Sequence, residues 1–262
     1  MRLRKFFSCC TALLFCLAIS APAFSAPLTK VRTAWMDEFE AFPIWYAKEK
    51  GWDKEAGLDL EILYFTSGMA ILNALPSGEW QYAAIGAVPA MMGALRYNTY
   101  VIANADEEFL INRVLVRPDS PIAKVKGWNK DYPEVLGSPE TVKGKTFLTT
   151  TVSSAHYALS VWLRVLGLTE KDIVLKNMDQ AQALSAYEDG IGDGVCLWAP
   201  HAYVGEAKGW KLVANPKLCG RSSYPPESMC AGAGRTCPGN RCPREPGERA
   251  GRGIARRTRK RP

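Results

Sequence analysis

The sequence has few of the residues and motifs on which enzymatic catalysis usually depends. It contains only two histidines, His156 and His201, and no Gly-x-Ser-x-Gly, Gly-x-x-x-x-Gly-Lys or Gly-x-Gly-x-x-Gly motif. These patterns mark the nucleophile of many hydrolases, the phosphate loop of nucleotide-binding proteins and the dinucleotide site of Rossmann folds. Their absence argues against those classes, and we expect no catalytic residues and no cofactor. An ordinary helix position is the simplest interpretation of His156.

Metal-binding patterns are also scarce. None of the eight cysteines forms a Cys-x-x-Cys pair, which is a spacing typical of zinc sites and redox pairs. A zinc site would have to combine Cys196 with His201 and with His156 or Cys219, and no two of these have a zinc-site spacing. Cys196 lies in an apolar segment and is most simply a small buried hydrophobic residue. We therefore expect no metal.

The apolar stretch near the start, residues 11–19, is too short to cross a membrane, which takes about 20 residues. Basic residues precede this stretch and small residues follow it up to Ser25, as in a secretory signal peptide. We predict a signal peptide at residues 1–25 and a periplasmic mature protein. The alternative is an ordinary hydrophobic N-terminal helix.

The formal net charge of +7 is distributed unevenly along the chain. The predicted signal peptide carries +3 and residues 220–262 carry +8, so residues 26–219 carry −4. The folded part is therefore mildly acidic, and we expect it to bind no nucleic acid.

The final 43 residues contain seven Gly, six Pro and ten Arg but few large hydrophobic residues. Such a segment cannot bury enough apolar surface to offset the loss of chain entropy on folding. We predict a disordered basic tail at residues 220–262, and we interpret it as the product of a frame shift or a gene fusion. A tail that binds nucleic acid or anionic membranes through its arginines is the alternative.

Between these ends, predicted strands alternate with predicted helices, which indicates an α/β fold with mainly parallel sheets. Apolar or alternating runs predict strands at 31–36, 58–64, 82–85, 100–103, 112–117, 145–149, 173–177 and 194–197. We divide the chain into a first lobe at 26–117 and a second lobe at 118–219, with the crossing between lobes just after Arg117.

One sequence pattern occurs twice, at residues 70–89 and at 182–200. Each copy reads as a helix, a glycine stop, a buried strand and a loop that ends in a proline, Pro89 or Pro200. Ligands of open α/β sheets bind beyond the carboxyl ends of the strands. We therefore expect the two proline-containing loops to face each other across a cleft between the lobes.

Helix N-termini at these strand ends favour anions through their free N–H groups and the helix dipole. Capping residues such as Ser67 and Ser153 are as well explained by ordinary helix capping. Trp198 is the aromatic residue that we favour as a wall of the cleft. If Glu40 or Glu107 points inward, the ligand instead carries a positive or hydrogen-bond-donating group, and the sequence leaves both possibilities open.

The chain resembles the periplasmic solute-binding proteins of the nitrate/sulfonate/taurine ABC importers, the NMT1-like or TauA/SsuA-type family. The resemblance covers about residues 31–219 and rests on the segments 38–51, 57–61, 67–69, 75–78, 150–154 and 190–200. It implies a two-lobed type II periplasmic binding protein fold. In that fold the chain returns to the first lobe near Cys219, where the basic tail begins, so we expect the first lobe to be incomplete.

The same resemblance implies a monomer that captures a small solute and delivers it to a membrane permease powered by a cytoplasmic ATPase. Contact with the membrane is then made only through the permease. By position, the ligand contacts fall on Glu40, Phe42, Ser67, Gly68, Gly86, Val88, Ser153, Ser154 and Trp198. The alternatives are an NMT1-like protein that binds or makes a thiamine pyrimidine precursor, and a non-functional truncated product.

Overall fold

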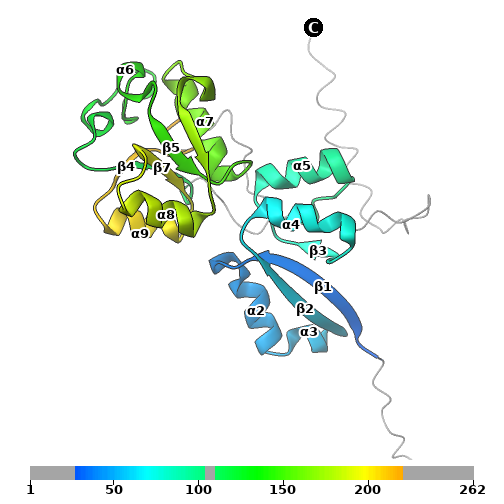
Figure 1. Ribbon diagram of the computed structural model, residues 1–262. Coiled ribbons are helices and arrows are strands. Elements are labelled where there is room, and N and C mark those ends of the chain that lie inside the picture. The colour runs from blue at the N-terminus through cyan, green and yellow to red at the C-terminus, as the bar shows by residue number, and fades with distance from the viewer. Residues whose placement is uncertain (1–26, 104–109, 221–262) are drawn as a thin grey trace, which may run out of the picture.

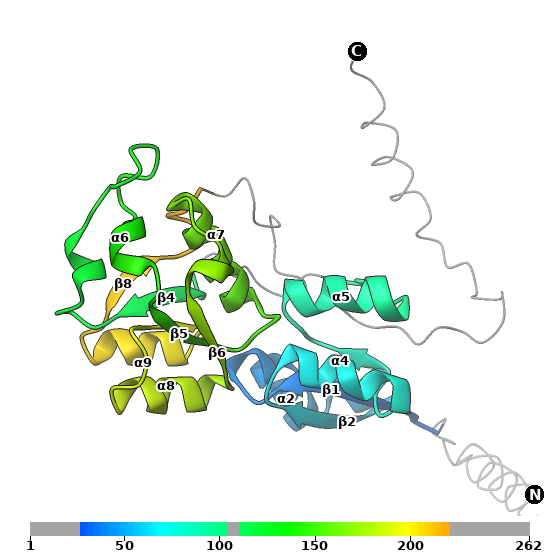
Figure 2. The same ribbon diagram turned by 45° about the horizontal axis from the view of Figure 1, so that its top comes forward.

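The computed structural model describes residues 27–103 and 110–220 (Figure 1). The predicted signal peptide, the acidic residues 106–108 and the tail from residue 221 lie outside the described residues. The described segments form two α/β lobes, each built on its own sheet (Figures 1 and 2). In this part of the chain, no helix combines the length and the hydropathy that crossing a membrane requires.

The first lobe is built on a three-stranded parallel sheet with the order β2-β1-β3. Its strands are β1 (Thr29–Met36), β2 (Leu58–Phe65) and β3 (Tyr82–Ala83). β1 and β2 pair along their whole length, whereas β3 adds only two residues. The helices are α2 (Phe42–Glu49), α3 (Trp52–Glu55), α4 (Gly68–Ala74) and α5 (Ala87–Tyr97), with the 3-10 helices η1 (Phe39–Ala41) and η2 (Leu75–Ser77).

Capping and turn residues determine where the helices of this lobe begin and end. Ser67 caps α4, because its Oγ accepts a 3.2 Å hydrogen bond from the N–H of Ala70. Pro43 lies in the first turn of α2, where its missing N–H is not needed. Gly78 follows η2 with a φ of 71°, a conformation that glycine adopts without steric cost.

The second lobe is built on a five-stranded sheet with the order β6-β5-β7-β4-β8. Its strands are β4 (Arg113–Val116), β5 (Thr146–Thr149), β6 (Val174–Asn177), β7 (Gly194–Leu197) and β8 (Lys211–Ala214). β5, β6 and β7 are mutually parallel, and β4 runs antiparallel to both β7 and β8. The helices are α6 (Pro139–Val142), α7 (Ser154–Val165), α8 (Gln180–Glu188) and α9 (His201–Ala207), with the 3-10 helices η3 (Pro121–Lys124) and η4 (Glu170–Asp172).

The central strands of this sheet are buried on both faces. Phe147 and Cys196 point into the cluster on the α7 side, whereas their neighbours Leu148, Val195 and Leu197 point into a second cluster beneath α8 and α9. The alternation follows from the two-residue repeat of a strand. It explains why these strands read in the sequence as continuous apolar runs rather than as alternating ones.

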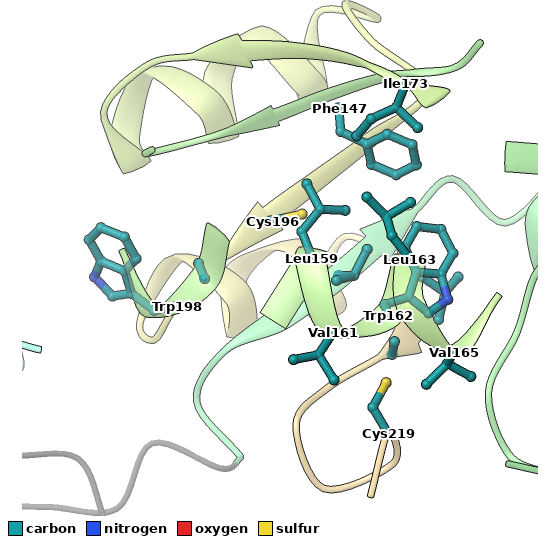
Figure 3. Packing of buried hydrophobic residues seen from close by; sticks show 14 of the residues in the cluster. Phe147, Leu159, Val161, Trp162, Leu163, Val165, Ile173, Cys196, Trp198 and Cys219 are labelled. Carbon is teal, nitrogen blue, oxygen red and sulfur yellow. The ribbon is translucent and has the colours of Figure 1, made fainter. Parts of the chain in front are cut away.

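Helix α7 supplies most of the cover on its side of the sheet (Figure 3). Trp162 is fully buried, and its ring meets Phe147 edge to face at a centroid distance of 5.5 Å. Its indole N–H donates a 2.9 Å hydrogen bond to the carbonyl of Leu136. Aromatic burial and a satisfied polar edge therefore fix the helix on the sheet.

The two copies of the repeated pattern adopt the predicted order of elements. In the first copy, α4 and η2 lead through Gly78 to β3 and then to α5; in the second, α8 leads through Gly190 to β7 and then to α9. The strand of the first copy is shorter than the predicted 82–85, because it pairs with β1 at only two residues.

Two predicted features of the first lobe differ in the structure. The strand 112–117, expected before the lobe boundary, is β4 and pairs with β7 and β8 in the second sheet. Residues 100–103 form no strand, and Tyr100 and Ile102 are exposed. Among the described residues, β3 is an edge strand of the first sheet, and no further strand pairs with its outer side. The order and direction of the three parallel strands β2-β1-β3 in the first sheet match those of β6-β5-β7 in the second.

Tyr187 gives a test of how the second lobe is held together. Its buried hydroxyl accepts a 2.8 Å hydrogen bond from the N–H of Arg117 and donates to the carbonyl of Asp193 at 3.2 Å. Tyr187→Phe leaves both backbone groups without this partner, and we expect a loss of about 1–3 kcal/mol in the free energy of unfolding, measured with urea. Tyr203→Phe is the control. Tyr203 is exposed, and its ring lies beneath the guanidinium of Arg113 as the ring of Tyr187 lies beneath that of Arg117. Equal effects of the two substitutions would contradict the interpretation.

Candidate functional site

A pocket of about 400 Å³, a volume that includes solvent at its mouth, lies where the strand ends of the two lobes meet. Its lining from the first lobe comes from the end of β1 and from the segments after β1, β2 and β3; its lining from the second lobe comes from the segments before β4 and after β5 and β7. The lining residues are Met36, Glu40, Ser67, Gly68, Met69, Gly86, Pro89, Ile111, Asn112, Thr150, Thr151, Val152, Ser153, Ser154 and Trp198.

The pocket brings together seven of the nine residues that the sequence singled out: Glu40, Ser67, Gly68, Gly86, Ser153, Ser154 and Trp198. Phe42 and Val88 are not in the lining. Phe42 is 58% exposed and stacks on Tyr46 at a centroid distance of 5.6 Å. Val88 lies on α5 next to Pro89, and successive residues of a helix point about 100° apart. Val88 therefore points in a different direction from Pro89, which lines the pocket.

Most of the lining residues that the sequence reasoning did not single out are neighbours of those that it did. Thr150, Thr151 and Val152 belong to the segment that leads into α7 and that supported the family resemblance. Asn112 carried no signal, because it lay at the start of an apolar run that predicted only a strand.

In the first lobe, a glycine allows two helix N-termini to approach each other. A Cβ atom on Gly68 would lie only 2.6 Å from Cγ of Pro89, which is closer than real Cβ contacts. Gly68 begins α4 and Pro89 lies in the first turn of α5. The absence of a side chain at residue 68 is therefore a packing requirement of the first half of the pocket.

In the second lobe, one buried amide holds two lining loops together. The side-chain oxygen of Gln180 accepts a 2.9 Å hydrogen bond from the N–H of Trp198, and its nitrogen donates to Oγ1 of Thr150 at 3.0 Å. Oγ1 of Thr150 in turn donates to the carbonyl of Met178. Gln180 is 2% exposed. Movement of either loop would leave a buried polar group without its hydrogen-bond partner, so this network favours a single arrangement of the two loops.

The hydroxyl groups at the start of α7 differ in what they bind. Oγ of Ser153 caps the helix by accepting from the N–H of His156 at 3.1 Å, and it donates to the carbonyl of Thr150 at 2.6 Å. Ser154 is 5% exposed, and its Oγ has no hydrogen-bond partner among the described residues. A buried hydroxyl is normally paired, so the unpaired Oγ of Ser154 is an exception among the hydroxyl groups at the start of α7.

Val152, within the same loop, has a strained backbone. Its φ is 55°, which is a left-handed conformation that β-branched residues rarely adopt. The strained peptide is held by a 3.1 Å hydrogen bond from its N–H to Nδ1 of His156, whose Nε2 lies 3.0 Å from Oε1 of Glu170. His156 therefore supports the loop from outside the pocket lining.

Trp198 connects the two lobes. Its indole N–H donates a hydrogen bond to Oε2 of Glu38 in the first lobe, two residues after the end of β1. The pKa of Glu38 is raised to about 7, chiefly by desolvation on burial; the bond from Trp198 lowers it, and the charge of Asp37 adds a smaller rise. The ring itself is 6% exposed, belongs to the hydrophobic cluster beneath α7, and lies at one end of the part of that cluster drawn in Figure 3.

The electrostatic character of the lining is unusual for an anion site. Glu40 belongs to the lining, and none of the described lining residues is Lys, Arg or His. Favourable interactions with negative charge come instead from the N-termini of α5 and α7. The described residues also contain no group of three or more His, Cys, Asp or Glu that could hold a metal ion.

The cysteines of the body lie away from this chemistry. Cys196 and Cys219 are free thiols and are buried. Burial raises the pKa of Cys196 far above its ordinary value and that of Cys219 to about 12, so neither is a reactive thiolate near neutral pH. The interpretation of Cys196 as a buried hydrophobic residue of a strand is confirmed.

Residues 25–215 match the NMT1-like family. The chain belongs to this family. A putative ABC transporter periplasmic binding protein of Brachyspira hyodysenteriae is 32% identical over 206 residues, which are 79% of this chain and 59% of that protein. The taurine-binding periplasmic protein of Escherichia coli is 24% identical over 208 residues, which are 79% of this chain and 60% of that protein.

Among solved structures, the alkanesulfonate-binding protein SsuA of Xanthomonas axonopodis pv. citri, bound to MOPS, matches with a TM-score of 0.62 at 19% identity. The match covers 80% of this chain and 67% of that one. The NMT1-like chain therefore has the α/β, two-lobed type II periplasmic binding protein fold, as the sequence predicted. It spans about three fifths of the length of the two curated relatives.

The strain at Val152 predicts an unusual effect of glycine. Relief of a left-handed conformation at a β-branched residue is worth on the order of 1–3 kcal/mol, and the greater freedom of glycine in the unfolded chain offsets roughly 0.5–1 kcal/mol of this. We expect Val152→Gly to raise the free energy of unfolding by about 1 kcal/mol in urea titrations. Val174→Gly, at an exposed strand position without positive φ, is the control and should be destabilising. A loss of stability in both variants would show that Val152 is not strained.

The raised pKa of Glu38 predicts a pH dependence of stability. The folded protein binds this proton more tightly than the unfolded chain, so the contribution of Glu38 to stability is fully present below about pH 4.5 and is lost as the pH rises through about 7. Each unit of pKa shift corresponds to about 1.4 kcal/mol. We expect Glu38→Gln to remove this decline between pH 4.5 and 7 in urea unfolding curves. Glu61→Gln, at an exposed pair with Arg32, should leave it in place; identical pH profiles for wild type and Glu38→Gln would refute the assignment.

Proposed function

We propose that the protein is the solute-binding component of an ABC importer and that it binds a small solute in the pocket between its lobes. The observation that carries the proposal is the pocket itself, which is lined by the strand ends of both lobes and by the N-termini of α4, α5 and α7. A ligand there touches both lobes at once and therefore stabilises their closed arrangement.

Membership of the NMT1-like family supports a solute of the nitrate, sulfonate or taurine class. Its relatives include the taurine-binding periplasmic protein of Escherichia coli and a putative aliphatic sulfonates-binding protein of Bacillus subtilis. They also support a periplasmic location and delivery of the solute to a membrane permease, which a cytoplasmic ATPase drives. Because each relative is named as a binding protein, we infer binding without catalysis.

The proposed binding cycle follows from the contacts around Trp198. In an open arrangement of the lobes, Trp198 would keep its contacts within the second lobe, among them the hydrogen bond from its N–H to Gln180. Closure on a solute brings the indole N–H to Glu38 and the ring against the ligand. The solute then replaces water in a pocket with a largely fixed set of donors, which is the usual source of selectivity in such sites.

A thermal-shift screen of the purified protein tests this function. The solutes are nitrate, bicarbonate, alkanesulfonates, taurine, simple amines and pyrimidines. At a concentration of 100 Kd, a solute that binds only the folded state stabilises it by about 2.7 kcal/mol, which raises the Tm by roughly 5–10 °C at this size. Trp198→Phe should reduce the shift, and Trp128→Phe, at an exposed position, should leave it unchanged. If no solute raises the Tm of the wild type, the protein is not a solute-binding component.

A further inference from the structure

The strained loop that leads into α7 is held by side chains that lie outside the pocket. Val152 belongs to the pocket lining, and its φ of 55° is a conformation that β-branched residues rarely adopt. Such a residue keeps its conformation only where the surrounding structure imposes it. The shape of this side of the pocket therefore depends on the groups that support the loop.

Two successive backbone N–H groups of the loop are bound by side-chain acceptors from different elements. The N–H of Thr151 donates to Oδ1 of Asn177, at the end of β6, at a distance of 2.8 Å. The N–H of Val152 donates to Nδ1 of His156, in the first turn of α7, at 3.1 Å. The loop is thus fastened to the sheet and to the helix, and His156 is the support that acts on the strained residue itself.

The contact with His156 is a variant of the capping box. In the usual box, the N-cap side chain accepts from the N–H of the third helical residue, and the side chain of that residue accepts from the N–H of the N-cap. Here Oγ of the N-cap Ser153 accepts from the N–H of His156, but His156 accepts from Val152, one residue before the cap. The second bond of the box therefore holds the strained residue instead of the cap.

This bond requires one tautomer of His156. A neutral imidazole carries its proton on one nitrogen and accepts at the other. Because Nδ1 accepts from Val152, the proton is on Nε2, which is buried and lies 3.0 Å from Oε1 of Glu170 in η4. The carboxylate favours this tautomer, since the other would turn a lone pair toward negative charge. The hydroxyl of Ser160 donates to the same carboxylate oxygen at 2.6 Å and so orients it.

We propose that His156 is a positioning residue for solute binding, whose Nε2-protonated ring, oriented by Glu170, holds Val152 in the left-handed conformation that shapes this side of the pocket. This inference rests on the proposed solute-binding function and adds a remote determinant of affinity to it. His156 lies outside the pocket lining, and the side chain of Glu170 is 44% exposed. The contacts therefore connect the molecular surface to the pocket.

A double-mutant cycle in urea unfolding tests the support without any solute. His156→Ala removes the acceptor from the N–H of Val152, and we expect it to lower the urea midpoint. Val152→Gly removes the need for the support, because glycine adopts a positive φ without steric cost. In the Val152→Gly background, His156→Ala should therefore lower the midpoint by about half as much or less. Additive effects would overturn the link between the two residues.

The same cycle in isothermal titration calorimetry tests the effect on affinity. The probes are nitrate, bicarbonate, ethanesulfonate, taurine, ethylamine and cytosine, one compound from each class of the thermal-shift screen. For a probe that binds the wild type, His156→Ala should weaken the affinity about tenfold, because the unsupported loop populates its lining conformation less often. In the Val152→Gly background, the same substitution should weaken it about threefold or less. His156→Asn, whose Oδ1 accepts near the position of Nδ1, should weaken it less than His156→Ala.

Two substitutions of Glu170 test the role of the tautomer. Glu170→Lys presents only donors to Nε2 and favours a proton on Nδ1, so it should weaken the affinity about as much as His156→Ala. Glu170→Gln keeps an acceptor for the Nε2 proton and should weaken it less. NMR spectra of the imidazole nitrogens should show the proton of His156 on Nε2 in the wild type and on Nδ1 in Glu170→Lys. Glu134→Lys, an exposed charge reversal outside the pocket lining, is the control and should leave the affinity unchanged.

The outcomes separate this inference from the proposed function. If a probe binds the wild type and His156→Ala with equal affinity, the positioning role is overturned and solute binding stands. If His156→Ala weakens the affinity equally in the wild-type and Val152→Gly backgrounds, its effect does not pass through the strained residue, and the inference is again overturned. If no compound of the screen binds the wild type, the proposed function and the positioning role are both overturned, whatever the urea midpoints show.

Discussion

The pocket depends on one tryptophan that is held from both lobes. Gln180 fixes the backbone of Trp198 in the second lobe, and Glu38 of the first lobe accepts its indole N–H. The ring lines the pocket while it is held from both lobes, so the position of the lobes and the shape of the pocket are coupled through this residue. The carboxyl of Glu38 is also partly desolvated, which links this contact to protonation in the neutral range.

Much of the fold could be predicted because its signals are local. Apolar runs, capping serines and glycine stops lie within a few residues of the elements that they define, and the repeated pattern carried the same signals twice. Strand pairing is different, because an apolar run does not state which sheet it joins. β4 was therefore assigned to the wrong lobe, and residues 100–103 were given a strand although no neighbour supplies its hydrogen bonds.

The candidate site, too, could be predicted only in part. Parallel strands send their following loops to one edge, so the segments around Ser67, Gly86 and Trp198 could be predicted to meet. The roles of single side chains could not. Ser153 and Ser154 are adjacent and chemically identical, yet one caps α7 and the other is unpaired, because backbone conformation decides which hydroxyl reaches the free N–H groups. The same limit applies to the inward position of Glu40.

The amide of Gln180 has a mechanical consequence. It accepts from one lining loop and donates to another, and a glutamate of the same shape could not do both. The loops after β5 and β7 are thus cross-linked inside the second lobe, independently of the first. In any movement of the second lobe relative to the first, these two loops therefore keep their relative positions, and the second half of the pocket keeps its shape.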